Sequence, residues 1–397
     1  MLSTPRSRIS GALAVVFVSF VVLGLPDGVF GTLWPTQRSD MNLAVGDLSW
    51  IIVGYTIGYA GGSVASGHIT ARWSTSAGMR VALVASFFGL IGFGLAPDLR
   101  SLVLVAIVVG GGAGLLDPIV NAWVALRHSA RAMGFLHAFF GLGAAIGPPF
   151  ATSALSGGIT WRGVFVILGF TQLGILAIVW AKRGDFDSGD LHETHADKTD
   201  TNHVESRLLV LTLVWFFLVV GLEVSASSWA FSLLFEDRGV AEGTAALWMA
   251  SFWGTFTLVR VLLGIVGDHL PQEGALWASI GVTLVGAALM WANPSGLAAG
   301  VSLPILGAGL SLLFPVMVLV TPRWLGPSRA AVATGYQFGA ASVGVVVFSV
   351  LIGQFAEASG LEVLGPVLFA VTVAAAVLLL VMRTEAERSS SQPAGQA

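Results

Sequence analysis

Long apolar runs alternate with short polar breaks along almost the whole chain. Each run is about as long as the 20 residues that a helix needs to cross a membrane. The first run is much longer than the apolar core of a signal peptide, so we retain it as a span. The pattern predicts an all-α membrane protein with twelve transmembrane helices, at about residues 9–35, 47–71, 77–96, 99–126, 131–156, 160–182, 208–235, 241–267, 272–293, 296–322, 329–356 and 361–383.

The composition agrees with this prediction. The 397 residues are 55% hydrophobic and only 10% charged, whereas soluble domains carry about 25% charged residues. A surface with so little charge must be covered by lipid. The net charge of -3 gives no reason to expect a nucleic-acid partner. The chain has no cysteine, which excludes disulfides and thiolate-bound metal sites, and no cofactor is predicted.

Lysine and arginine are distributed unevenly among the predicted loops. With the N-terminus inside, fourteen lie on the cytoplasmic side, four lie outside, and Arg260 falls within a span. This bias predicts an integral protein of the cell membrane with both termini in the cytoplasm. The acidic stretch 184–206 is interpreted as a cytoplasmic linker, and residues 384–397 as a disordered cytoplasmic tail.

An internal repeat appears when the sequence is shifted by 197 residues. The shift aligns glycines and prolines at equivalent positions in five spans, among them Gly24 with Gly221, Gly110 with Gly307, Pro118 with Pro315, and Gly147 with Gly344. One constant offset across several helices predicts two pseudo-symmetric six-helix halves, residues 1–183 and 207–383. That arrangement is typical of a transporter whose binding site lies between the halves.

Three acidic residues lie inside predicted spans: Asp27, Asp117 and Glu223. An ionisable side chain at the centre of a span costs about 2.5–3.5 kcal/mol on insertion scales, so its retention suggests a function. A carboxyl group in a low-dielectric cavity can load and release a proton near neutral pH. We therefore predict that these three residues couple transport to protons. Sodium is an alternative, because carboxylates bind both ions, and an inert hydrogen-bonded acid is the structural alternative.

Polar and aromatic side chains extend this candidate site. Asn121 follows Asp117 by four residues and Trp34 follows Asp27 by seven, so each shares a helix face with its acid. Such groups can bind the hydroxyls and the C–H face of a sugar. For the tryptophans, packing or interfacial anchoring is an equal alternative. The predicted substrate site comprises Asp27, Trp34, Asp117, Asn121, His137, Glu223, Trp229, Trp253 and Gln337.

Arg260 is the only basic residue predicted to lie in the interior of a span, away from its ends. It can bind an anionic substrate, or it can pair with an acid such as Asp268 and form part of a gate. We favour the gate, because anion carriers usually need a cluster of cations. The sequence has no phosphate-binding loop and no HExxH or GxSxG motif, so an enzyme is not predicted.

Several strings carry a family resemblance: Gly24-Leu25-Pro26-Asp27-Gly28, Leu116-Asp117-Pro118-Ile119-Val120-Asn121, His137-Ala138-Phe139-Phe140-Gly141, Gly221-Leu222-Glu223, Phe252-Trp253-Gly254, and the loop motif Gly264-Ile265-Val266-Gly267-Asp268. With these strings the chain resembles the major facilitator superfamily. Within it, the chain is similar to the fucose/galactose/glucose:proton symporter group and to relatives resembling sodium-dependent glucose transporters. The resemblance implies the major facilitator fold. It also implies that Asp27 and Asp117 stand where fucose permeases have acids for substrate and proton. The chain departs from those permeases at His137 and Phe140, where they carry amides. It departs from the loop motif of the superfamily at Ala71, which replaces the acid in the first half.

These observations predict a monomeric carrier that imports a neutral, hexose-like sugar with a proton by alternating access. The main alternative is a proton-driven exporter of amphipathic, drug-like compounds, because Gly134, Gly143, Gly147 and Pro148 nearly reproduce the fifth-helix motif of drug exporters. That motif fails at Ala151-Thr152, and the fourth-helix arginine of such exporters is absent from residues 102–110. Export is therefore ranked second. A sodium-coupled sugar symporter and a membrane-bound sensor are further alternatives.

Overall fold

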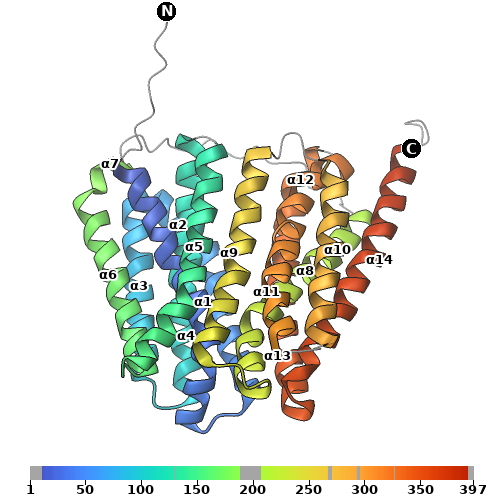
Figure 1. Cartoon of the computed structure of the whole chain (residues 1–397). Coiled ribbons are helices and arrows are strands. Elements are labelled where there is room, and N and C mark those ends of the chain that lie inside the picture. The colour runs from blue at the N-terminus through green and yellow to red at the C-terminus, as the bar shows by residue number, and fades with distance from the viewer. Residues whose placement is uncertain are drawn as a thin grey trace, which may run out of the picture. The chain divides into compact units, whose positions relative to one another are not determined.

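The computed structural model describes residues 11–128, 130–187, 207–266, 271–292, 296–325 and 327–391. These residues form helices joined by short turns, with no strand among them (Figure 1). The helices are α1 (Gly11–Met41), α2 (Leu48–Arg72), α3 (Thr75–Leu95), α4 (Leu99–Arg127), α5 (Ala130–Ser156), α6 (Trp161–Ala181), α7 (Arg183–Asp187), α8 (Arg207–Ser232), α9 (Glu242–Val266), α10 (Gln272–Ala292), α11 (Gly296–Leu310), α12 (Leu313–Leu325), α13 (Pro327–Ser359) and α14 (Leu364–Ser391).

Twelve helical segments of the described residues are long and apolar enough to cross a membrane. They correspond one to one with the twelve predicted spans, so the predicted fold class is confirmed. The chain is therefore an integral membrane protein. Helix boundaries differ by a few residues, as expected where the hydropathy pattern alone sets them.

Two predicted boundaries need correction. The last helix, α14, continues to Ser391, so residues 384–391 are helical and not disordered. Arg383 Nε donates to Glu387 Oε1 at 2.9 Å, a pair four residues apart that stabilises this extra length. At the other predicted polar segment, residues 184–187 belong to the short helix α7. The remaining linker, 188–206, and the last residues, 392–397, lie outside the described residues.

The predicted span 296–322 forms two helices, α11 and α12, separated at Ser311 and Leu312. Pro315 explains the break, because it has no N–H to donate to the carbonyl of Ser311 four residues earlier. Pro118 stands at the equivalent position in α4, which stays continuous around it. The same proline therefore has a larger effect in the second repeat than in the first.

The chain divides into two compact units. The first comprises residues 1–29 and 54–192, and the second comprises residues 30–53 and 193–397. The first unit contains α3 to α7 with the matching parts of α1 and α2, and the second contains α8 to α14. Residues 30–53, which end α1 and begin α2, belong to the second unit although the sequence assigns them to the first half.

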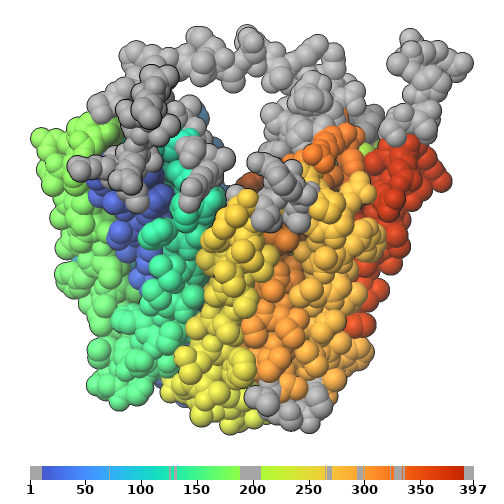
Figure 2. Space-filling view, turned by 45° about the horizontal axis from the view of Figure 1, so that its top comes forward, coloured from blue at the N-terminus to red at the C-terminus, as the bar shows by residue number. Residues whose placement is uncertain are grey.

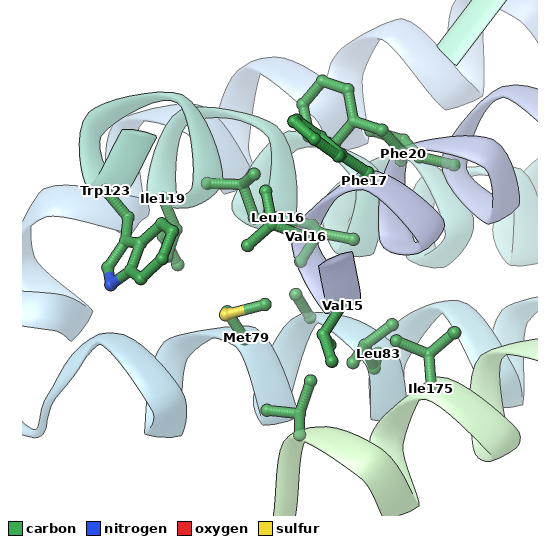
Figure 3. Packing of buried hydrophobic residues seen from close by; sticks show 14 of the residues in the cluster. Val15, Val16, Phe17, Phe20, Met79, Leu83, Leu116, Ile119, Trp123 and Ile175 are labelled. Atoms are coloured by element: carbon green, nitrogen blue, oxygen red, sulfur yellow. The ribbon is translucent and has the colours of Figure 1, made fainter. Parts of the chain in front are cut away.

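Large apolar side chains from four helices form the core of the first unit. Figure 3 shows Val15, Val16, Phe17 and Phe20 of α1 near Met79 and Leu83 of α3, Leu116 and Ile119 of α4, and Ile175 of α6. Val16, Met79 and Leu83 have no exposed surface. Without a hydrophobic driving force between helices in lipid, such close packing is what holds these helices together.

Glycine contacts repeat at the offset of 197 residues inside each unit. A Cβ atom at Gly110 of α4 would overlap the carbonyl oxygen of Tyr55 in α2, and one at Gly307 of α11 would overlap that of Phe252 in α9. Both residues of the first contact thus lie 197 positions before those of the second. The predicted pseudo-symmetry is therefore visible as the same backbone contact in both repeats.

Candidate functional site

Glycines place α2 directly against α4 in the first unit. Besides Gly110, a Cβ atom at Gly114 would overlap the carbonyl oxygen of Tyr59, and one at Gly58 would overlap that of Ile107. The two backbones approach this closely only because no side chain separates them. The contact brings the phenol ring of Tyr59 to the carboxyl group of Asp117, three residues beyond Gly114.

Both carboxylate oxygens of Asp117 accept hydrogen bonds from side chains. The hydroxyl of Tyr59 donates to Oδ2 in a short hydrogen bond. The amide of Asn121 donates to Oδ1 at 2.6 Å and to the main-chain oxygen of Asp117 at 2.9 Å. Hydrogen bonds to a carboxylate are stronger than those between neutral groups and fix its orientation. The predicted pairing of Asp117 and Asn121 along one helix face is present.

Asp27 and His137 join the same cluster from α1 and α5. The hydroxyls of Tyr55 and Tyr59 lie within electrostatic range of Asp27 as well as Asp117, and the imidazole of His137 lies within range of Asp117. The rings of Tyr55 and Tyr59 stack with centroids 6.4 Å apart. His137 is exposed, and the other members are half-buried. The cluster therefore combines two carboxyls, two phenols, an amide and an imidazole that remain accessible.

The site predicted from the sequence does not include Tyr55 and Tyr59. Their role depends on the contact between α2 and α4, and nothing in the local sequence around a tyrosine specifies the helix opposite it. The sequence does contain a pattern that indicates the contact between α2 and α4. One face of α2 alternates tyrosine and glycine, at Tyr55, Gly58, Tyr59 and Gly62, and α4 carries a matching run of glycines from Gly110 to Gly114.

Glu223 and Arg260 form a second polar group, within the second unit. Arg260 Nε donates to the main-chain oxygen of Ser311 at 3.2 Å. Its guanidinium lies over the ring of Phe256, 4.1 Å from the centroid, and within electrostatic range of Glu223. Arg260 thus binds the carbonyl freed by Pro315 and supplies a positive charge near Glu223. Its predicted gate partner, Asp268, lies outside the described residues.

The other predicted site residues of the second unit are buried. Trp34 has no exposed surface, and its Nε1 donates to the main-chain oxygen of Val45 at 3.0 Å. The amide of Gln337 donates to the hydroxyls of Thr212 and Thr321 at 3.0 and 3.1 Å. Trp229 and Trp253 are 0% and 5% exposed. These contacts give Trp34 and Gln337 structural roles, and none of the four rings or amides presents an open surface.

The family model of the Major Facilitator Superfamily matches residues 16–303. This match covers well over half of the chain. The chain belongs to this superfamily. The helical fold, the repeat and the absence of enzyme motifs agree, since members with this fold are transporters and not enzymes.

Curated relatives of this superfamily member are distant in sequence. It is 25% identical over 283 residues to the yeast (Saccharomyces cerevisiae) protein "Bypass of stop codon protein 6", covering 64% of this chain and 57% of that protein. It is 23% identical over 385 residues to human "Sodium-dependent glucose transporter 1", covering 85% of this chain and 73% of that protein. It is 25% identical over 321 residues to a "Glucose/galactose transporter" of Brucella abortus, covering 76% of each.

Among solved structures, the fold is similar to that of a bacterial homologue of the human lysosomal transporter Spinster, in an inward-facing and unoccupied conformation. The TM-score is 0.76 at 14% identity, covering 98% of this chain and 100% of the other. At this identity the similarity bears on the fold alone.

Proposed function

We propose that the protein imports a neutral, hexose-like sugar together with a proton by alternating access. Membership of the Major Facilitator Superfamily supports transport, and the relatives named as glucose and galactose transporters support a sugar as cargo. The observation that carries the proposal is the cluster around Asp117. It offers carboxylate acceptors and phenol and amide donors within spans, which suits a substrate rich in hydroxyls.

Asp27 and Asp117 share proton binding and hydroxyl recognition in this proposal. Asn121, Tyr55 and Tyr59 orient the carboxyls, and His137 is a proton partner at the accessible side of the cluster. Glu223 acts from the second unit, together with Arg260. Coupling requires that proton and sugar each raise the affinity for the other, which is a reciprocal free-energy linkage.

Uptake into proteoliposomes with an imposed pH gradient tests the proposal. The wild type should accumulate a hexose when the outside is acidic, and Asp117→Asn should abolish accumulation. Asp98→Asn is the matched control, because Asp98 is an exposed acid that caps α4 outside the cluster. Absence of accumulation in the wild type, or full accumulation in Asp117→Asn, would overturn the proposal. A sodium gradient in place of the pH gradient tests sodium as the coupling ion.

Thermal stability of the purified protein, measured with different ligands, distinguishes a sugar importer from an exporter of amphipathic compounds. Ligands that bind only the folded protein raise its melting temperature. Stabilisation by hexoses supports the proposal, whereas stabilisation by lipophilic cations and not by hexoses favours an exporter. Binding of a hexose without any flux would instead indicate a sensor.

The predicted orientation and oligomeric state belong to the same proposal. Since the chain has no cysteine, single cysteines can be introduced without a background. Asp40→Cys should react with an impermeant thiol reagent from outside the cell, and Glu387→Cys should not. Light scattering of the purified protein should give the mass of a monomer.

A further inference from the structure

Two lipid-facing stripes run side by side on α3 and α6. Arg80, Val84 and Phe88 follow one another at intervals of four residues on α3, and Val84 and Phe88 are exposed. Phe170, Leu173, Ala177 and Trp180 follow one another at intervals of three or four on α6, and all are exposed. Such spacing places each set on one helix face. The two helices pack together in the first unit, and Figure 1 shows them adjacent.

Ring contacts connect the two helices at both ends of these stripes. Arg80 lies over the ring of Trp180, with Cζ 4.7 Å from the centroid. Towards the other end, Phe87 meets Phe170 edge to face at 5.9 Å. The stripes therefore form one continuous apolar strip with a cation at one end, about 12 Å long from Arg80 to Phe88 by helical rise. Figure 2 shows side chains of α6 on the surface of the first unit.

The guanidinium of Arg80 is fixed in place by the protein. Its Nε donates to the main-chain oxygen of Ser76 at 3.2 Å, and one face stacks on Trp180. Among the described residues, no carboxylate forms an ion pair with it. A stacked, half-buried arginine presents its remaining N–H groups in a fixed fork, a geometry that suits bidentate binding of a phosphate.

The charged groups around Arg80 leave an excess of positive charge. Arg183 donates from Nη1 to the main-chain oxygen of Trp180 at 3.3 Å, which adds a second cation at this end of α6. Lys182 pairs with Asp185 at 3.9 Å. Asp187 is engaged by Ser76, accepting from its N–H at 2.9 Å and from its hydroxyl at 2.7 Å. The acids therefore have other partners, and Arg80 and Arg183 remain available to an anion.

We infer that this apolar strip binds an anionic phospholipid, with its phosphate on Arg80 and Arg183 and one acyl chain along the stripes of α3 and α6. The apolar stripe fits a chain and the cationic end fits a headgroup, in the order in which a membrane lipid presents them. The predicted orientation places Arg80 in the cytoplasmic leaflet, where anionic lipids are concentrated and each basic residue near the surface is stabilising.

A second arginine in the same unit provides a matched control. Arg162 also stacks on a tryptophan, 4.1 Å from the centroid of Trp161, and donates from Nη2 to the main-chain oxygen of Ala96 at 3.4 Å. Trp161, however, is only 3% exposed, whereas Trp180 is 57% exposed. Arg162 thus shares the stacking of Arg80 without an open apolar ring beside it.

Native mass spectrometry of the purified full-length protein tests the inference. Phosphatidylglycerol and phosphatidylcholine with the same chains are added in competition to the wild type, Arg80→Gln, Arg162→Gln and Arg80→Lys. We expect the wild type to retain phosphatidylglycerol in preference, and Arg80→Gln to lower that preference about fivefold, the effect of one basic residue at a membrane surface. Arg162→Gln should match the wild type. Arg80→Lys should keep only part of the preference, because an ammonium group keeps the charge and lacks the planar fork; a retained part also shows that the site tolerates substitution without unfolding.

Two further experiments test the apolar strip and the source of the phosphate. Ala177→Trp places a bulky ring across the strip while leaving Arg80 unchanged, and should lower retention of both lipids. Glycerol 1-phosphate, which has the headgroup without acyl chains, should not displace the bound lipid. The inference fails if the wild type does not discriminate between the lipids, if Arg80→Gln keeps the wild-type preference, if Arg162→Gln loses as much, or if glycerol 1-phosphate competes equally.

Discussion

Pro118 and Pro315 occupy the same place in the two repeats, yet the carbonyl oxygens they free are bound by different side chains. In the first unit, Ser63 Oγ donates to the oxygen of Gly114 at 3.1 Å. In the second, Arg260 Nε donates to the oxygen of Ser311 at 3.2 Å. Each member of the second contact lies 197 residues after its counterpart in the first. The contact thus has the same position in both repeats, but its donor is a neutral hydroxyl in the first and a charged guanidinium in the second.

The neighbouring residues differ in the same way. Tyr59, which donates to Asp117, is replaced at the equivalent position by Phe256, on which Arg260 stacks. The first unit therefore satisfies Asp117 with neutral hydroxyl and amide donors, while the second places a permanent cation near Glu223. A carboxyl held by neutral donors can gain and lose a proton without breaking an ion pair. This difference favours the first unit as the proton-binding part of the proposed mechanism.

The largest expected effect follows from removing the cation of the second unit. Arg260→Leu leaves Glu223 without its countercharge and the carbonyl of Ser311 without its donor. A carbonyl oxygen without its donor and a half-buried carboxylate without its nearby cation each cost about 1–3 kcal/mol, so we expect a combined loss of about 3 kcal/mol. Thermal unfolding of the purified protein measures the loss. Arg260→Ser, which installs the residue of the first repeat, should lose less, because a serine hydroxyl can donate to Ser311 as Ser63 does to Gly114.

A double substitution separates the two contributions. Arg260→Leu combined with Glu223→Gln removes the unpaired charge and should recover part of the lost stability. If the double variant is no more stable than Arg260→Leu alone, Glu223 and Arg260 are not energetically coupled, and the contrast between the units is wrong.

The next effect concerns the first unit. Tyr59→Phe makes position 59 identical to its counterpart Phe256 and removes the donor to Asp117 Oδ2. A hydrogen bond to a charged group contributes about 1.5–3 kcal/mol, so proton-driven hexose uptake should fall roughly tenfold or more. In an Asp117→Asn background, the same change should have little further effect, measured as ligand-induced thermal stabilisation. Additive losses in the two backgrounds would show that Tyr59 acts independently of Asp117.

The helices and one contact of the candidate site, that of Asp117 with Asn121, could be predicted from the sequence for physical reasons. Twelve spans follow from hydropathy, and Asp117 with Asn121 follows from the spacing of one helix. Tyr59 did not follow, because its partner lies on another helix. The equivalence of the hydrogen bonds made by Ser63 and Arg260 could have been predicted, because the offset that aligns Pro118 with Pro315 also aligns Ser63 with Arg260. The burial of Trp34 and Gln337 could not be predicted, because residue type alone does not determine it.

A smaller effect tests the framework that both units share. Gly110→Ala and Gly307→Ala each insert a methyl group against a backbone carbonyl oxygen, so both should destabilise the protein by about 1–3 kcal/mol. Gly111→Ala is the matched control, because its nearest neighbour, the oxygen of Gly58, would be 3.7 Å from the new Cβ atom. It should be neutral or slightly stabilising, since alanine favours helix more than glycine. Thermal unfolding that shows Gly110→Ala and Gly307→Ala to differ strongly would contradict an equivalent framework.

The smallest expected effect is a difference in the pH dependence of stability between two equivalent positions of the repeats, His128 and Leu325. Burial, with a smaller contribution from Arg127, lowers the pKa of His128 below its usual 6.5, while the equivalent residue, Leu325, does not titrate. The folded protein therefore favours neutral His128. Its contribution to stability is present above pH 6.5 and is lost as the pH falls through the lowered pKa. The melting temperature of His128→Leu should accordingly fall less than that of the wild type between pH 7.5 and pH 5, whereas Leu325→Met should follow the wild type. Equal falls in His128→Leu and the wild type would mean that this histidine does not sense pH, and that the two repeats are alike at this end.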